Sequence, residues 1–216
     1  MDHLAVSTAA RPRRQMVITA PPTEGPLNLV LFGPPGAGKG TQADRLALRY
    51  HVPKISTGDM LRTAIQDRSR IGELVRDTLD RGALVGDDLI ISLVGQRLEQ
   101  PDTVNGFVLD GFPRTIPQAA ALDALLADRG RVIVIALVVH VDEVIRRLSD
   151  RGRADDEAFV IRERLAIYSR DTEPVLDYYR RRSAVTILDG NRPTGAVTED
   201  IEAAVSTASR PSPRNS

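Results

Sequence analysis

The sequence predicts an α/β fold in which helices cover a central parallel β-sheet. Short apolar segments alternate with longer segments of helical periodicity along most of the chain, and this order requires parallel strands joined by helices that pack on the sheet. The longest apolar run, residues 132–139, is far shorter than the roughly 20 residues that cross a bilayer. It is typical of a strand buried on both faces. We therefore expect no membrane association.

The expected strands are short, and each is followed by a helical pattern. The strands are expected at residues 27–32, 53–55, 106–110, 132–139 and 184–188. The helices are expected at residues 38–50, 59–81 in two pieces, 116–128, 142–149 and 197–206. The resulting β-α-β-α order predicts a single sheet with helices on both faces.

Composition limits the partners that the chain can have. Lysine plus arginine and aspartate plus glutamate both number 29, so no overall field attracts nucleic acid or an anionic membrane. The chain has no cysteine, which excludes disulfides and thiolate zinc sites. We expect no nucleic-acid partner and no structural zinc. A cytoplasmic location is compatible with this composition.

The two ends of the chain have the composition of solvated segments. Residues 1–26 contain four prolines and an arginine cluster but no apolar run long enough for a secretory signal. We expect a disordered leader at 1–26, a single domain at 27–207 and a disordered tail at 208–216. The arginines of the leader leave open an organelle transit peptide as the alternative.

A glycine-rich loop follows the first expected strand and opens the first expected helix. GPPGAGKGT fits the phosphate-binding template G-x-x-x-x-G-K from Gly33 to Lys39, but Gly40 replaces the usual Ser or Thr and Thr41 comes one residue late. Backbone N–H groups of such a loop turn toward phosphate oxygens, and the helix N-terminus adds partial positive charge. The alternative is a plain turn, but the strand, loop and helix context favours a phosphate site.

Four further motifs follow this loop in a recognisable order. They are ISTGDMLR at 55–62, LVGDDL at 84–89, DGFPRTIPQ at 110–118 and RGRADD at 151–156. With the loop, they closely resemble the adenylate kinases, in the nucleoside monophosphate kinase family, over residues 27–207. In this family the loop carries the extra glycine as a rule. The resemblance implies a P-loop kinase fold with a helical insertion that binds the nucleoside monophosphate (NMP) at 56–85 and a very short lid at 150–156.

The resemblance implies an ATP site that combines the loop with three arginines. Arg147 and Arg151 stand one helical turn apart and therefore share a face of their helix. The implied ATP-binding residues are Gly36, Ala37, Gly38, Lys39, Gly40, Thr41, Arg147, Arg151 and Arg192.

The resemblance also implies an AMP site, which the insertion would close over. Thr57 and Gln118 match positions that recognise adenine, and two features typical of pyrimidine-specific relatives are missing: Ala in place of this Thr, and an Asn-rich segment after GFPR. The alternative roles are helix capping for Thr57 and a surface amide for Gln118. The implied AMP-binding residues are Thr57, Arg62, Ala83, Leu84, Val85, Gly111, Phe112, Pro113, Arg114, Gln118, Arg153 and Arg164.

Phosphoryl transfer between two nucleotides requires many cations and little covalent chemistry. The acceptor is already an anionic phosphate, so no catalytic base is needed. The resemblance implies that Asp110 holds Mg²⁺ through water, with Thr41 as a second candidate ligand. The implied catalytic residues are Lys39, Arg114, Arg151, Arg153 and Arg164. Three arginines are offset from the motifs and are expected to be exposed, namely Arg146, Arg162 and Arg170.

The sequence therefore predicts a monomeric, magnesium-dependent phosphotransferase that acts on ATP, AMP and ADP. Two alternatives stay open. One is a kinase of UMP, CMP or another nucleoside monophosphate. The other is a nucleotide-binding regulator of the same fold without useful transfer activity.

Overall fold

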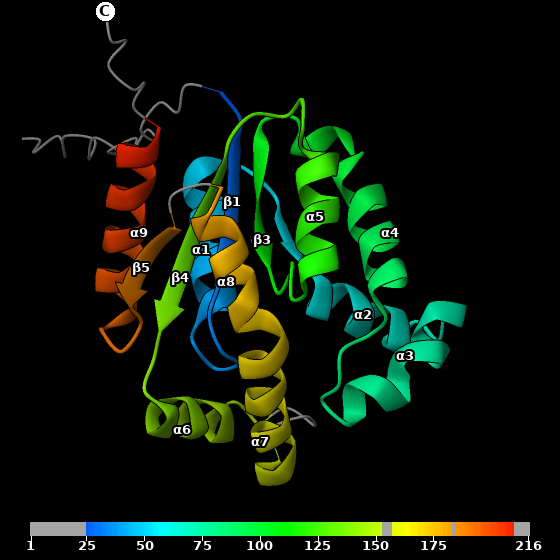
Figure 1. Ribbon diagram of the computed structural model, residues 1–216. Coiled ribbons are helices and arrows are strands. Elements are labelled where there is room, and N and C mark those ends of the chain that lie inside the picture. Colours follow the sequence, from blue (N-terminus) through cyan, green and yellow to red (C-terminus); the bar gives the residue numbers. More distant parts are fainter. Residues whose placement is uncertain (1–24, 153–156, 183–184, 210–216) are drawn as a thin grey trace, which may run out of the picture.

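The computed structural model describes residues 25–152, 157–182 and 185–209. Within these ranges, five parallel strands form one sheet in the order β2-β3-β1-β4-β5, and helices cover both of its faces (Figure 1). The strands are β1 Leu27–Phe32, β2 Lys54–Ser56, β3 Gly106–Asp110, β4 Val132–Val138 and β5 Val185–Asp189. The predicted fold class is confirmed, and each strand lies within a residue or two of its expected position.

Helices connect the successive strands, and a further helix follows β5. They are α1 Lys39–Tyr50, α2 Thr57–Gln66, α3 Arg70–Asp80, α4 Asp87–Leu98, α5 Ile116–Leu125, α6 Val141–Arg151, α7 Ala158–Ile167, α8 Glu173–Arg180 and α9 Thr194–Ala208, with a 3₁₀ turn η1 at Pro101–Thr103 and a π-helical turn η2 at Tyr168–Thr172. No helix of the described ranges is long and apolar enough to span a bilayer.

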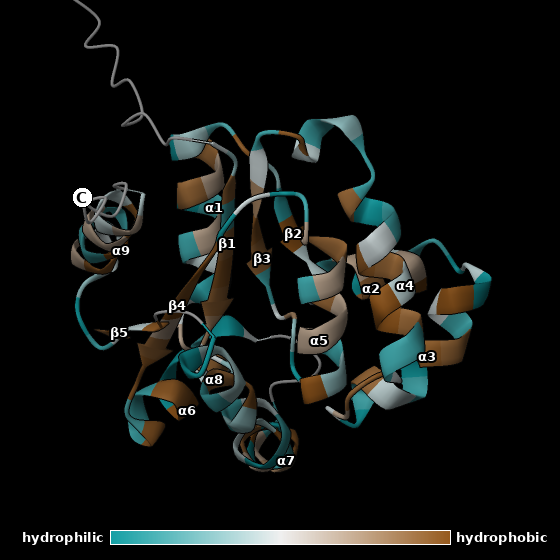
Figure 2. Ribbon diagram, turned by 45° about the horizontal axis from the view of Figure 1, so that its top comes forward, coloured by the Kyte–Doolittle hydropathy of each residue, from teal (hydrophilic) through white to brown (hydrophobic). Residues whose placement is uncertain are grey.

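The alternation of side chains along the strands creates two apolar cores, one on each face of the sheet. In β1, Leu29 and Leu31 pack with α1, α6 and α9, whereas Val30 and Phe32 pack with α2 to α5 and α8. Every residue of β1 is buried, as expected for a central strand of a parallel sheet. Figure 2 shows the central strands coloured as hydrophobic between helices of mixed character.

The expected helix at residues 59–81 is divided in two, as predicted, but it begins earlier. The hydroxyl of Ser56 accepts a hydrogen bond from the backbone N–H of Asp59, 3.3 Å away, and caps the N-terminus of α2 at that point. Ser69 caps α3 in the same way. The two caps explain both the start of α2 at Thr57 and the break between the helices.

Three helices have no counterpart among those predicted: α4, α7 and α8. In α4 the buried residues Ile90, Val94 and Leu98 recur every fourth position, but the other apolar residues around them hide this spacing in the sequence. In α8 the second residue is Pro174, which suggests a break but is tolerated in the first helical turn. The predicted leader and tail lie almost entirely outside the described residues.

Candidate active site

A cavity of about 560 Å³ lies at the carboxyl ends of the strands. The end of β1 forms the floor of this cavity. β1 has β3 on one side and β4 on the other, so the connections that leave the ends of the neighbouring strands run to opposite sides of the sheet at this point. Open α/β sheets bind ligands at this point, and the volume is within the usual range of about 300–1,000 Å³ for ligand pockets. The position and size favour a ligand site.

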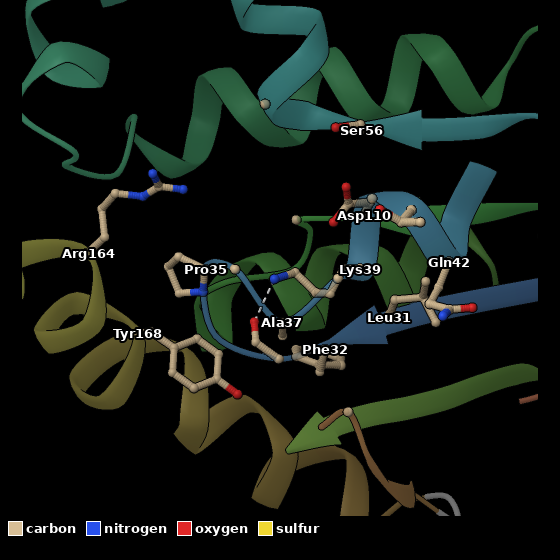
Figure 3. A pocket seen from close by; sticks show the side chains of 18 of the residues that line it. Leu31, Phe32, Pro35, Ala37, Lys39, Gln42, Ser56, Asp110, Arg164 and Tyr168 are labelled. Atoms are coloured by element: carbon tan, nitrogen blue, oxygen red, sulfur yellow. Dashed lines mark hydrogen bonds between the residues drawn. The ribbon is translucent and has the colours of Figure 1, made fainter. Parts of the chain in front are cut away.

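The glycine-rich loop between β1 and α1 forms one wall of the cavity (Figure 3). Gly36 has a positive φ of 80°, and a Cβ there would lie 2.9 Å from a side-chain carbon of Leu148 and 3.0 Å from the carbonyl oxygen of Val144. Glycine is therefore required both by the backbone conformation and by the packing of the loop against α6. This packing fixes the loop in front of the N-terminus of α1, where backbone N–H groups can bind an anion.

Lys39 extends from the start of α1 over the loop. Its ammonium group donates hydrogen bonds to the carbonyl oxygens of Gly33 at 2.7 Å and Pro34 at 2.9 Å. Burial lowers the pKa of Lys39 from its ordinary value of 10.5 to about 8, and the carboxylate of Asp110 opposes this shift. Three nearby guanidinium groups lower it further, those of Arg114, Arg164 and Arg151. A phosphate bound here would relieve this repulsion and favour the charged lysine.

The structure gives a physical reason for Gly40 in the loop. A Cβ at this position would lie 3.3 Å from Oδ2 of Asp110 and 3.9 Å from Nζ of Lys54. Any side chain at position 40 would therefore crowd the Asp110 carboxylate at the end of β3. Glycine leaves this carboxylate open to the cavity, which Thr41 also lines.

The open carboxylate of Asp110 fits a magnesium ion that keeps most of its water and takes its other ligands from substrate phosphates. Within the described residues, no group of three or more His, Cys, Asp or Glu side chains is arranged to hold a metal. The residues at this wall therefore suit a cation that arrives with a phosphate ligand rather than one enclosed by the protein alone.

Six of the arginines singled out from the sequence line the cavity, although they come from five separate parts of the chain. They are Arg62, Arg114, Arg147, Arg151, Arg164 and Arg192. Arg147 is held in place by Glu143 at 2.7 Å and by the carbonyl oxygen of Gly190 at 3.0 Å. Arg153 lies outside the described residues. With Lys39 and Lys54, these arginines give the cavity the charge needed for polyphosphate.

The three arginines that are offset from the motifs are exposed, as predicted. The side chain of Arg146 is 61% exposed and pairs with Glu143 and Asp150 on the surface of α6. Arg170 is 70% exposed and pairs with Asp171, and Arg162 is also exposed. These residues supply matched controls for the arginines of the cavity.

A second, smaller cavity adjoins the first beneath α2 and α3. The residues that line it include Thr57, Ala83, Leu84, Val85, Gly111 and Gln118. Phe112 and Pro113 line the larger cavity instead. The Thr57 hydroxyl donates to the carbonyl oxygen of Gly111 at 2.9 Å, and Gln118 is only 2% exposed. Because Ser56 caps α2 and Gln118 is buried, the alternative roles of helix cap and surface amide do not apply to these two residues.

Comparison with known proteins agrees with this arrangement. The adenylate kinase family model matches residues 31–184. The chain is 47% identical to the adenylate kinase of Caulobacter sp. (strain K31) over 186 residues, which cover 83% of this chain and 98% of the relative. It is 43% identical to the adenylate kinase of Xanthobacter autotrophicus over 194 residues, which cover 84% of this chain and 100% of the relative. It is 39% identical to the adenylate kinase of Archaeoglobus fulgidus over 210 residues, which cover 82% of this chain and 97% of the relative.

The chain belongs to the adenylate kinase family. The resemblance stated from the motifs is thus confirmed, and with it the class of enzyme, a phosphotransferase. The segment between α6 and α7 is only residues 152–157, and 153–156 lie outside the described residues.

Lys54 also lines the larger cavity, although no motif in the sequence indicated it. Its ammonium group lies 2.9 Å from Oδ1 of Asp44 in α1 and 3.3 Å from Oδ2 of Asp59 in α2, and Asp59 in turn pairs with Arg62 at 2.5 Å. Burial lowers the pKa of Lys54, but the two carboxylates outweigh it, so the net shift is upward. A lysine in a short, mostly buried strand directly before the STGD motif was the signal available in the sequence.

Tyr168 and Thr172 of the π-helical turn were also missed. Both line the larger cavity, and Figure 3 shows Tyr168 on the same side of it as Arg164. Burial, with Glu173 nearby, raises the pKa of Tyr168 to about 12, so its hydroxyl stays neutral. Thr172 donates to the carbonyl oxygen of Arg114 at 3.1 Å and so ties this turn to the DGFPR segment. π-Helical turns are frequent at functional sites, but nothing in the sequence marks this one.

Proposed function

We propose that this chain is an adenylate kinase that transfers a phosphoryl group from ATP to AMP, giving two molecules of ADP. The observation that carries this proposal is the junction between the two cavities. Arg62, Arg114 and Arg164 line both of them, so their guanidinium groups stand between the loop and the pocket of Thr57 and Gln118. Two nucleotides bound with their bases apart would meet phosphate to phosphate at this junction.

In the proposed reaction, the loop and Lys39 bind the β- and γ-phosphates of ATP, and Arg62 binds the phosphate of AMP. An anionic oxygen of AMP attacks the γ-phosphorus in line, the bond from that phosphorus to the bridging oxygen breaks, and ADP leaves with the bridging oxygen. No proton has to be removed from the nucleophile. The protein therefore acts by positioning and by neutralising the charge on the transferred group. Arg114, Arg151 and Arg164 supply this charge.

Asp110 would hold Mg²⁺ through water, and Thr41 is the second candidate ligand. When bound, the ion neutralises negative charge on the ATP phosphates. The open carboxylate beside Gly40 supports this assignment. The ATP side would be completed by the loop at residues 36–41, by Arg147 of α6 and by Arg192 in the segment between β5 and α9. The absence of cysteine from the sequence supports a site without zinc.

The proposed AMP side combines Thr57 and Gln118 with the backbone of residues 83–85 and the GFPR segment. Arg153, implied by the family pattern, is part of this proposal as well. Residues 56–85 would close over AMP, and the short lid at 150–156 would leave the exclusion of water to Arg151, Arg164 and Tyr168. The single domain at 27–207 contains all of these residues. This completeness within one chain supports a monomer. The balanced charge supports the proposed lack of nucleic-acid and membrane partners, and the composition is compatible with a cytoplasmic location.

The proposal is tested by measuring ADP formation from ATP and Mg²⁺ with AMP, GMP, UMP and CMP as acceptors. AMP should give the highest kcat/KM. Higher turnover of UMP or CMP would assign the chain to another acceptor within the family. Binding of ATP without ADP formation from any acceptor would favour the nucleotide-binding regulator.

A further inference from the structure

Gln118, which borders the smaller cavity, has a side-chain amide that is held at both ends. The backbone N–H of Arg114 donates to Oε1 of Gln118 at 2.8 Å. At the other end, Nε2 of Gln118 donates to Oδ1 of Asp87 at 2.7 Å. Since the residue is 2% exposed, water does not compete for these bonds.

The two partners determine which way the amide points. A backbone N–H can only donate, and an ionised carboxylate can only accept. Rotating the amide by half a turn would break both hydrogen bonds and would place Oε1 against the carboxylate and the NH₂ group against the N–H. The orientation of a glutamine amide is determined by its hydrogen-bond partners, and here both partners select the same orientation.

Asp87 is itself fixed from two sides. The hydroxyl of Thr115 lies 3.0 Å from both of its carboxylate oxygens. Asp87 is also the first residue of α4, where the helix dipole favours a negative charge. Thr115 is the N-cap of α5 and accepts a bond from the backbone N–H of Gln118. The carboxylate therefore joins the N-termini of two helices, and it lies behind Gln118, outside the described lining of both cavities.

The fixed amide still has one acceptor and one donor to offer. Oε1 uses one of its two lone pairs on Arg114, and Nε2 uses one of its two hydrogens on Asp87. Adenine presents a donor at its 6-amino group and an acceptor at N1, which match this pair. A 6-oxopurine presents the reverse, an acceptor at O6 and a donor at N1. Recognising it would require the amide to turn around.

We propose that Asp87 is a specificity-determining positioning residue, which fixes the amide of Gln118 so that the site takes a 6-aminopurine monophosphate and rejects a 6-oxopurine monophosphate. This inference rests on the proposed function, because it concerns the acceptor of the same reaction. Sites that pair every hydrogen-bonding group of the correct substrate discriminate strongly against analogues that leave those groups unpaired.

The test compares Asp87→Asn with Asp88→Asn. Both aspartates lie in the first turn of α4, so the loss of charge near the helix terminus is matched, but Asp88 is exposed and no described hydrogen bond joins it to Gln118. Asn at position 87 can accept or donate, so the amide of Gln118 is free to turn. The measured quantity is the ratio of kcat/KM for AMP to kcat/KM for inosine monophosphate, with ATP and Mg²⁺ saturating.

We expect the ratio to fall by about tenfold or more in Asp87→Asn, through a loss with AMP and a gain with inosine monophosphate, and to stay within about twofold of wild type in Asp88→Asn. A parallel loss with both acceptors, at unchanged ratio, would assign Asp87 a merely structural role and overturn the inference. If the wild-type chain makes no ADP from AMP, the proposed function fails instead, so the two failures are distinguishable.

A second pair of variants covers the case in which Asp87→Asn does not fold. Thr115→Val removes the hydroxyl that orients the carboxylate, whereas Thr115→Ser retains it. Loss of the cap costs only about 1 kcal/mol, so Thr115→Val should still fold. The ratio should fall in Thr115→Val and hold in Thr115→Ser, and an unchanged ratio in both would again contradict the inference.

Discussion

Replacement of Gly40 by alanine should separate stability from activity. Gly40 is the second residue of α1 and is not among the residues with positive φ, so alanine is allowed there, and in a helix it favours folding by about 0.5–1 kcal/mol. The new Cβ would lie 3.3 Å from Oδ2 of Asp110, closer than ordinary van der Waals contact, so the carboxylate must move by a few tenths of an ångström. The free energy of unfolding should therefore stay within about 1 kcal/mol of wild type.

Activity should respond far more strongly, because Asp110 faces the proposed magnesium site. Misplacement of a positioned group by about 1 Å can cost a factor of about 100 in rate, so a smaller shift should lower kcat by about tenfold and raise the Mg²⁺ concentration needed for half-maximal rate. The assay is ADP formation against Mg²⁺ concentration, combined with thermal unfolding. Gly195→Ala is the matched control, since Gly195 is the second residue of α9 and its added Cβ would have nothing within 4 Å.

Gly195→Ala should gain similar stability and keep full activity. If Gly40→Ala proved as active as Gly195→Ala, with the same dependence on Mg²⁺, the reasoning that glycine keeps Asp110 open would be refuted.

Three further predictions concern the lysines. Lys39→Met should lower kcat/KM by at least about 1,000-fold, because the transferring group loses the cation of the glycine-rich loop. Arg146→Ala, on the exposed face of α6, should stay within about twofold of wild type. Equal losses in steady-state kinetics would contradict the division between site and surface cations. Because the pKa of Lys39 in the folded chain is about 8, kcat/KM for ATP should decline as the pH rises through 8. A pH profile of kcat/KM that is flat through pH 8 would argue against this pKa. Between about pH 8 and 10.5 the lysine is protonated in the unfolded chain but not in the folded chain, so the contribution of Lys39 to the free energy of unfolding should rise with pH over that window. Lys54→Met should raise KM for AMP by about two- to fivefold with little change in kcat. Asp59 would then hold Arg62 without a competing cation, and partly exposed ion pairs of this kind are worth up to about 1 kcal/mol. A lower KM for AMP in this variant would contradict the interpretation.

Local patterns in the sequence were sufficient for the sheet and for the phosphate-binding loop. β1 and the loop are adjacent in the chain, and the glycines that allow the turns of the loop lie within it, although the packing of Gly36 against α6 is a long-range contact. The motifs then indicated most of the residues that line the two cavities. The helices α4 and α7 were missed because their apolar residues do not gather on one clear face, and α8 was missed because Pro174 suggests a break.

The contacts that complete the site could not be predicted, because they join residues far apart in the chain. Asp87 and Gln118 are 31 residues apart, and Thr172 is 58 residues from Arg114. Lys54 and Asp44 are only 10 residues apart, but they meet because β2 returns beside α1. No periodicity or motif indicates such a pair, since its formation depends on how helices pack on the sheet.

The stoichiometry of the reaction tests the central claim most directly, namely that one site passes a phosphoryl group from ATP to AMP without water. Phosphorus NMR of the chain with ATP, AMP and Mg²⁺ would follow all phosphate species together. We predict two molecules of ADP for each ATP consumed, loss of one AMP, and no inorganic phosphate. Release of inorganic phosphate at unchanged AMP, or consumption of neither nucleotide, would contradict the account.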